Sequence, residues 1–130
     1  MDVLVVEDEP LVREVVADGL QDDGLCVVEA PTAEEALALF TNDGRPQVVV
    51  TDVNLGSGMD GLTLAEEAHR RWLDVGVVIM TGNPVNVLGR PSDPCERILL
   101  KPFMPTVLSQ CVRELLGGSC RDAERHPAQQ

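Results

Sequence analysis

Five polar or charged residues stand directly after short apolar runs in this chain of 130 residues. A charge at the tip of a buried strand is unfavourable unless partners gather there, so these tips indicate a common site. Carboxylates brought together repel one another and favour a bound cation. Magnesium prefers oxygen ligands and often takes one or two carboxylates together with phosphate oxygens. The set therefore predicts a magnesium-dependent phosphoryl site, with the residues Glu7, Asp8, Asp52, Thr81 and Lys101.

The acidic residues suit the metal in different ways. Asp8 and Asp52 are the natural direct ligands, and Glu7 can act through a bound water. The backbone carbonyl of Asn54 lies two residues past Asp52 and can complete the protein's share of the ligands. These four positions are the predicted Mg²⁺ ligands.

Asp52 can also act as a nucleophile and form an acyl phosphate, because it ends the strand expected at the centre of the sheet. Lys101 supplies positive charge that offsets the charge of the transferred group. The Thr81 hydroxyl can then donate a hydrogen bond to a phosphoryl oxygen. A phosphate adds about 1.5 to 2 negative charges, which is enough to reorganise a nearby hydroxyl, lysine and loop.

The apolar runs themselves predict the strands that carry these residues. They are continuous rather than alternating, which is typical of strands buried on both faces of a parallel sheet. The expected strands are Val3–Val6, Cys26–Val28, Val48–Thr51, Val75–Thr81 and Ile98–Leu100.

Amphipathic stretches between the runs predict helices, because apolar residues recur there at helical spacing. The expected helices are Pro10–Asp23, Thr32–Asn42, Gly61–Trp72 and Pro105–Leu116. The apolar stripe of the first is Leu11, Val12, Val15, Val16, Gly19 and Leu20. Residues 82–97 contain three prolines and two glycines, so we expect at most a short helix near Pro84–Leu88. Residues 119–130 lack apolar periodicity and are expected to form a disordered tail after a domain of residues 1–118.

Alternating strands and helices predict an α/β fold with a doubly wound, five-stranded parallel sheet. Right-handed crossovers place helices on both faces of such a sheet. Ligands bind beyond the carboxyl ends of its strands. All the candidate site residues fall at that edge.

Composition restricts the classes of partner. The net charge of −12 argues against binding to nucleic acid or to a membrane surface, because both need basic patches. No apolar stretch approaches the ~20 residues of a membrane span, and the first residues do not resemble a signal peptide. The four cysteines form no C-x-x-C pair. We therefore expect a cytoplasmic protein with free thiols, with Cys26 and Cys111 in the core.

The segments that carry the candidate site resemble a known family. VLVVEDEP, VVVTDVNL, VVIMTGN and LLKPF are similar to the signature segments of two-component response-regulator receiver domains. M-D-G-L at 59–62 resembles the segment that opens the family's third helix. The resemblance covers about residues 2–116, keeps the motifs in order and is nearest to single-domain chemotaxis receivers. It implies a flavodoxin-like sheet with strand order 2-1-3-4-5.

The resemblance also implies a role for each site residue. Asp52 would be the phosphoacceptor, with Glu7 and Asp8 as the acidic pair. Thr81 and Lys101 would be the switch residues, and the bond from Lys101 to Pro102 would be cis. The donor would be a phosphohistidine on a histidine kinase or phosphotransfer protein. The phosphorylated domain, a monomer or weak dimer, would then bind a downstream protein target.

Three features differ from the usual family pattern. The segment NLGSGMDG is one residue longer than usual and lacks the usual proline. Ile98 stands where many relatives have Tyr or Phe, so an aromatic ring cannot report the switch at this position. The proline-rich segment 82–97 is short, so the surface formed by the family's fourth helix and fifth strand is expected to be remodelled.

Two other functions stay open. A degenerate receiver would act only as an interaction module. An aspartyl phosphatase would resemble D-x-D-x-T, but Asn54 replaces the second aspartate and cannot act as a general acid. We therefore expect no enzyme, beyond magnesium-dependent self-phosphorylation and self-dephosphorylation. With no output domain after residue 118, we expect either a stand-alone receiver or a domain of a hybrid kinase or longer regulator.

Overall fold

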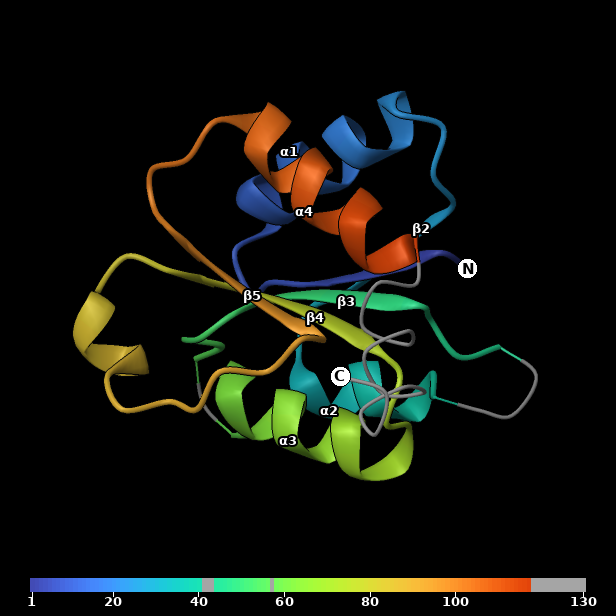
Figure 1. Ribbon diagram of the computed structural model, residues 1–130. Helices are drawn as coiled ribbons and strands as arrows, with labels where there is room; N and C mark the ends of the chain where they lie inside the picture. Colours follow the sequence, from blue (N-terminus) through green and yellow to red (C-terminus); the bar gives the residue numbers. More distant parts are fainter. Residues whose placement is uncertain (41–43, 57, 118–130) are drawn as a thin grey trace, which may run out of the picture.

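The computed structural model describes residues 1–40, 44–56 and 58–117 (Figure 1). The expected tail, 119–130, lies outside the described residues. The strands are β1 (Val3–Val6), β2 (Val27–Ala30), β3 (Val48–Asp52), β4 (Gly76–Thr81) and β5 (Glu96–Leu100). The helices are α1 (Pro10–Asp22), α2 (Ala33–Ala38), α3 (Gly61–Arg71) and α4 (Pro105–Leu116), with a 3₁₀ helix, η1 (Pro84–Val87). None of the described helices has the length and hydrophobicity needed to cross a membrane.

The predicted fold is confirmed. All strand pairs are parallel, and the order across the sheet is β2-β1-β3-β4-β5. Helices α1 and α4 cover one face, and α2 and α3 cover the other (Figure 1). The strands β1, β3 and β4 are buried along their whole length, as continuous β-branched runs require. The edge strands β2 and β5 are only partly buried.

Several element boundaries differ from the sequence-based expectation by one or two residues, and the end of α2 differs by four. Strand β2 begins one residue later than expected and extends to Ala30, because its pairing with β1 runs from Val27 to Ala30. Helix α2 ends at Ala38 rather than at Asn42. Its start is as predicted, since the backbone N–H of Glu35 donates to the Thr32 hydroxyl at 3.0 Å.

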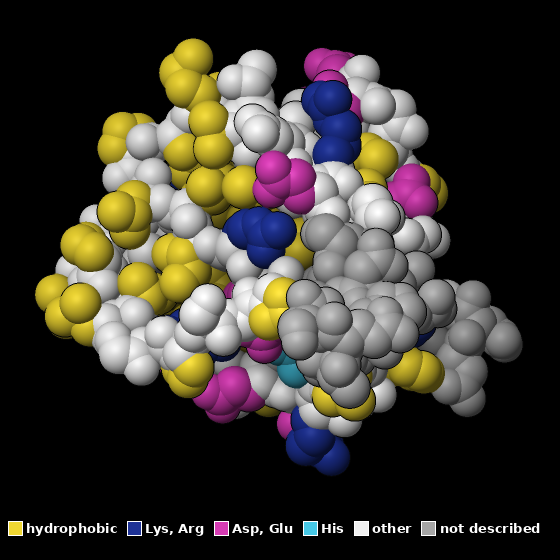
Figure 2. All heavy atoms as spheres, in the orientation of Figure 1, with side chains coloured by type: hydrophobic (Ala, Val, Ile, Leu, Met, Phe, Trp, Pro, Cys, Tyr) yellow, Lys and Arg dark blue, Asp and Glu magenta, His cyan; other side chains and the backbone are white. Residues whose placement is uncertain are grey.

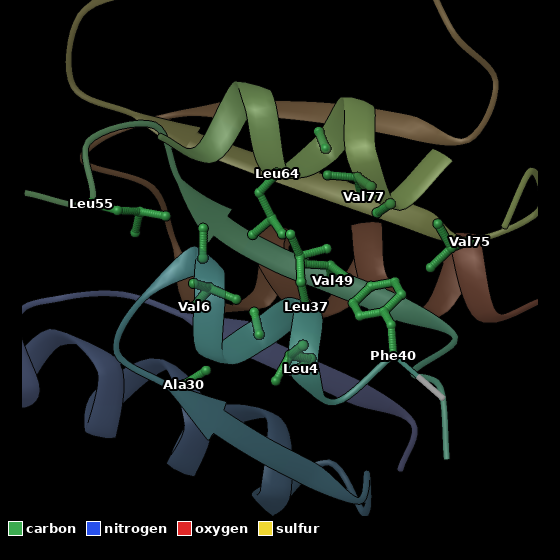
Figure 3. Close-up of a cluster of buried hydrophobic side chains, with 14 of the residues drawn as sticks. Leu4, Val6, Ala30, Leu37, Phe40, Val49, Leu55, Leu64, Val75 and Val77 are labelled. Carbon is green, nitrogen blue, oxygen red and sulfur yellow. The ribbon is translucent and has the colours of Figure 1, made fainter. Parts of the chain in front are cut away.

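The core consists of two aliphatic clusters, one on each face of the sheet. Figure 3 shows the cluster between the sheet and helices α2 and α3, where Leu4, Val49 and Leu64 meet. On the other face, Leu20 of α1 and Val112 of α4 pack on side chains of β1, β3 and β4. Alternate residues of each central strand therefore enter opposite clusters, which fixes the register of the sheet.

The apolar stripe predicted for α1 is only partly buried. Ala17 and Leu20 are the buried residues of this helix. Leu11 and Val15 are each 70% exposed, and Val12 is also exposed. The stripe is broader than the surface that α1 presents to the sheet and α4, so its outer edge faces solvent. This helix therefore carries an apolar surface that the core does not use.

The cysteines differ from the expectation of free thiols in the core. Cys26 and Cys111 are free, but only Cys111 packs against the core. Cys26 lies just before β2 and is exposed. Its backbone N–H donates to the Asp2 carboxylate at 2.8 Å. Cys95 is buried and disulfide-bonded, which corrects the expectation for that thiol. Cys120 lies outside the described residues.

Residues 82–97 form no α-helix, and η1 is their only helical segment, as the prolines predict. Figure 1 shows η1 at the carboxyl edge of the sheet, beyond β4. Without a longer helix, the β5 face opposite α4 stays open, and Ile98 and Leu100 are 41% and 51% exposed. Hydrophobic side chains gather on this side of the molecule, at the left of Figure 2. The short η1 therefore leaves an apolar surface open along β5.

Gly61 brings the start of α3 against the end of β3. Its N–H donates to the carbonyl of Val53 at 2.8 Å. A Cβ atom at this position would lie 1.9 Å from the carbonyl oxygen of Asp52 and 3.0 Å from the Thr51 hydroxyl. Only glycine permits this approach, so α3 directly supports the tip of the central strand.

Replacing Gly61 with alanine is expected to lower the free energy of unfolding by roughly 2–4 kcal/mol, because the methyl group overlaps backbone that cannot move freely. The control is Gly19→Ala in α1, where a Cβ would meet nothing within 4 Å. That change should be neutral or stabilise by up to about 1 kcal/mol through helix propensity. Urea denaturation measures both, and equal effects would contradict the close approach.

Candidate functional site

The register of β1 and β3 brings two acidic residues together at the carboxyl edge. Val6 pairs with Thr51, so the next residues, Glu7 and Asp52, end neighbouring strands. Both side chains are buried in large part, and Glu7 is only 3% exposed. The end of β1 is fixed by α1, because the Arg13 guanidinium donates to the Glu7 carbonyl at 2.9 Å.

The register of β3, β4 and β5 adds the other two candidates. Asp52 pairs with Met80, which precedes Thr81. Thr81 in turn pairs with Leu100, and Lys101 follows. The N–H of Lys101 donates to the carbonyl of Thr81 at 2.8 Å, which holds the tips of β4 and β5 together. The sheet itself therefore gathers the predicted residues.

The Asp52 carboxylate is held through both of its oxygens. Oδ2 forms an ion pair with the Lys101 ammonium, and Oδ1 accepts a hydrogen bond from the backbone N–H of Asn54 at 3.0 Å. The Lys101 side chain is one-third exposed, so the pair lies at the boundary between core and solvent. As predicted, lysine and aspartate meet although they are far apart in sequence.

The Glu7 carboxyl is poorly satisfied. Its Oε2 atom is buried and has no hydrogen-bond partner among the described residues. Burial, and after it the hydrogen bond and repulsion of Asp52, raise the pKa of Glu7 to about 7, although Lys101 opposes the shift. The protein thus holds a carboxyl that would ionise more readily beside a cation.

Asp8 is exposed and flanks the buried pair from the loop after β1. The loop after β3 approaches it closely, since a Cβ at Gly56 would lie 3.2 Å from Asp8 Oδ2. Among the described residues, no three Asp, Glu, His or Cys side chains are close enough to enclose a metal on their own. The unsatisfied Glu7 oxygen and the oxygen-only donor set nevertheless fit Mg²⁺, which completes its octahedron with water and phosphate.

The Thr81 hydroxyl is bound by the segment that follows β4. It donates to the carbonyl of Asn83 at 3.0 Å and accepts from the N–H of Asn83 at 3.1 Å. The side-chain amide of Asn86 donates to it at 3.1 Å. Asn86 could not be identified from the sequence, where its position in the expected short helix was the only signal for this contact.

A cavity of about 340 Å³ opens beside Lys101, between α1 and α4. Its lining is mostly apolar and includes Val12 and Val15 of α1 and Phe103 of the connection to α4. The peptide bond from Lys101 to Pro102 is cis, as predicted. The cavity therefore borders both the apolar edge of α1 and Lys101 of the charged site.

Comparison with known protein families identifies the family to which this chain belongs. Residues 3–113 match the family described as the response regulator receiver domain. The chain belongs to this family. Receiver domains are the signalling modules of two-component systems, and membership of this family accounts for the fold described above.

Individual relatives agree with this assignment. The receiver is 33% identical over 120 residues to the transcriptional regulatory protein AruR of Pseudomonas aeruginosa, covering 88% of this chain and 48% of AruR. It is 30% identical over 125 residues to a chemotaxis protein CheY homolog of Campylobacter jejuni, covering 90% of this chain and 93% of the homolog. The chain thus spans about half the length of AruR but nearly all of the CheY homolog.

A solved structure provides a closer chemical comparison. Response regulator protein TrrA of Thermotoga maritima, in complex with Mg²⁺ and BeF, superposes with a TM-score of 0.77 and 29% identity. The match covers 88% of this chain and 99% of TrrA. This relative shows that a receiver of the same fold holds Mg²⁺ together with BeF.

The raised pKa of Glu7 predicts a pH-dependent stability in metal-free buffer. The folded receiver retains this proton up to about pH 7, whereas the unfolded chain loses it near pH 4.5. Its contribution to stability is therefore full below about pH 4.5 and is lost as the pH rises through about 7. Glu7→Gln should match the wild type near pH 4.5 and be more stable at pH 8 by roughly 1–3 kcal/mol.

Urea denaturation with a chelator at the two pH values measures this difference. Addition of Mg²⁺ at pH 8 should stabilise the wild type more than Glu7→Gln, because only the wild type gains an ionised carboxylate. Parallel pH profiles of the two proteins would contradict the burial of a titrating Glu7.

Proposed function

We propose that this receiver domain is a phosphorylation-controlled switch whose phosphoacceptor is Asp52. The observation that supports this proposal most directly is the ion pair of Asp52 with Lys101 beside the buried carboxyl of Glu7. A carboxylate at the tip of the central strand, with a cation on one side and an unsatisfied acid on the other, suits phosphoryl transfer.

In the proposed reaction, a carboxylate oxygen of Asp52 attacks the phosphorus of a phosphohistidine. A P–O bond forms and the P–N bond breaks, and the electron pair of that bond stays on the imidazole nitrogen. Lys101 is already at the carboxylate and can follow the charge onto the phosphoryl oxygens. The Thr81 hydroxyl can bond one of those oxygens once it leaves its resting partners.

Mg²⁺ would be held by Asp8 and Asp52, by Glu7 directly or through water, and by the backbone carbonyl of Asn54. When bound, the ion would neutralise charge that develops on the phosphoryl oxygens. Glu7 supports this assignment, because its buried Oε2 has no hydrogen-bond partner within the described part of the chain. The same residues make the receiver dependent on magnesium for phosphorylation.

The phosphodonor is proposed to be a histidine kinase or histidine phosphotransfer protein that docks on the cavity between α1 and α4. The apolar edge of α1 leads directly to Lys101, so a helix packed on Val12 and Val15 can bring its histidine to the site. A net charge of −12 favours a donor with a basic surface around this contact. We place the domain in the cytoplasm, where kinases use ATP.

Phosphorylation would change the binding of a downstream protein, with the receiver acting as a monomer or weak dimer. It would not act as an enzyme on added substrates, and only its own phosphorylation and dephosphorylation would be catalysed. The alternative is a degenerate receiver that serves only as an interaction module. Amide resonances around Asp8 and Asp52 distinguish the two, because a degenerate receiver would not respond to Mg²⁺.

Intact mass spectrometry tests the phosphoacceptor. After incubation with Mg²⁺ and a small acyl-phosphate or phosphoramidate donor, the wild type should gain one phosphoryl group. Asp52→Asn should gain none, because the carboxamide is not a nucleophile of this kind. Chelation of Mg²⁺ should abolish the adduct in the wild type. A wild type that stays unmodified in the presence of Mg²⁺ would reject the proposal.

Docking on α1 is tested by Val15→Glu, which places a charge on the apolar edge of the helix. With a protein phosphodonor, kcat/KM should fall about tenfold or more, whereas phosphorylation by phosphoramidate should be unchanged. Leu73→Glu is the matched control, because Leu73 is as exposed as Val15 but lies after α3. An equal loss with both variants would argue against docking on α1.

A further inference from the structure

The hydrogen-bonding capacity of the Thr81 hydroxyl is fully used in this structure. A hydroxyl has one hydrogen to donate and two lone pairs that accept. Its hydrogen goes to the carbonyl of Asn83, and its lone pairs receive the N–H of Asn83 and the side-chain amide of Asn86. Any new bond from this hydroxyl to another group therefore requires that a present bond breaks.

The partners of the hydroxyl belong to the start of η1. The N–H of Asn86 also donates to the Asn83 carbonyl at 3.0 Å, so that carbonyl joins the hydroxyl and the 3₁₀ helix. The Asn83 side chain caps η1 by accepting from the N–H of Val85 at 3.0 Å. Asn86 is the one residue that reaches back from within η1 to the hydroxyl with its side chain.

We propose that Asn86 is a positioning residue that holds the Thr81 hydroxyl in its resting orientation and opposes its movement toward a phosphoryl group on Asp52. This inference rests on the proposed function. Asn86 is only partly exposed, so its amide bond is sheltered from water and contributes to the resting state. The short η1, in place of a longer helix, brings this amide within reach of the strand tip.

The arrangement also gives η1 a way to respond to the site. A phosphoryl oxygen can only accept, so the hydroxyl must turn its hydrogen away from the Asn83 carbonyl to bond it. When the hydroxyl also moves toward the phosphoryl group, Asn86 loses its partner and the first turn of η1 is less constrained. By reciprocity, anything that holds η1 in place makes phosphorylation less favourable. Val85 and Leu88 are exposed on and beside η1, so the change would reach the surface within a few residues.

Phosphorylation rates test the role of Asn86. With Mg²⁺ and phosphoramidate, Asn86→Ala should be phosphorylated about two- to tenfold faster than the wild type, the range expected for loss of one neutral hydrogen bond. The same acceleration should occur when Asn86→Ala is combined with Thr81→Ser, which keeps the hydroxyl. It should disappear when Asn86→Ala is combined with Thr81→Ala.

Amide hydrogen exchange gives a second measurement on the unmodified chain. In the wild type, Mg²⁺ with beryllium fluoride should raise the exchange of the N–H groups of Val85, Asn86 and Leu88. In Asn86→Ala these amides should already exchange faster without the probe, and the probe should add little. Circular dichroism checks that each variant is folded.

Each outcome has a separate meaning. If the wild type is phosphorylated and Asn86→Ala reacts at the same rate, Asn86 does not hold the hydroxyl. Acceleration of equal size in the Thr81→Ala background would show a general effect on η1 and would also reject the inference. If no protein that retains Asp52 acquires a phosphoryl group, the proposed function fails and the role of Asn86 fails with it.

Discussion

The ion pair between Asp52 and Lys101 is the interaction on which the rest of the site depends. Two acids, Glu7 and Asp52, end adjacent strands in a largely buried environment, and the Lys101 ammonium pairs with the Asp52 carboxylate. Without it, the site would contain buried negative charge with few partners, which is strongly unfavourable. The pair forms only if β3, β4 and β5 lie in their observed register. Conversely, the aliphatic clusters on both faces, which fix that register, determine the chemistry at its edge.

The shortened segment after β4 changes the surroundings of this charged centre without changing the centre itself. A longer helix would cover β5, whereas η1 leaves Ile98 and Leu100 exposed and places Asn86 at the Thr81 hydroxyl. The face near α1 and the face near η1 are therefore distinct surfaces. One borders the Asp52 and Lys101 pair, and the other borders Thr81, so the two can contact different proteins.

The sequence was sufficient for the sheet and for the strand-tip residues, because both follow from patterns local to each strand. Glu7, Asp52 and Lys101 could be predicted since parallel strands bring their carboxyl ends to one edge. Which residues of α1 are buried could not be predicted, because the apolar stripe from Leu11 to Leu20 does not show which part of it meets the sheet. The exposure of Cys26 and the contact from Asn86 likewise depend on how connections fold across strand ends, and no residue spacing encodes this.

The close approach at Gly61 makes the position of Asp52 independent of the length of the loop after β3. Because α3 is anchored against the backbone of the strand tip, the connection between them can lengthen without moving Asp52. Gly56 and Gly58 adopt positive φ angles between β3 and α3, and the Glu34 carboxylate of α2 accepts a hydrogen bond from the N–H of Met59. Insertions in this connection would change the loop near Asp8 and leave the contact of Gly61 with the Asp52 backbone unchanged. The domain can thus vary access to Asp8 while the position of Asp52 is preserved.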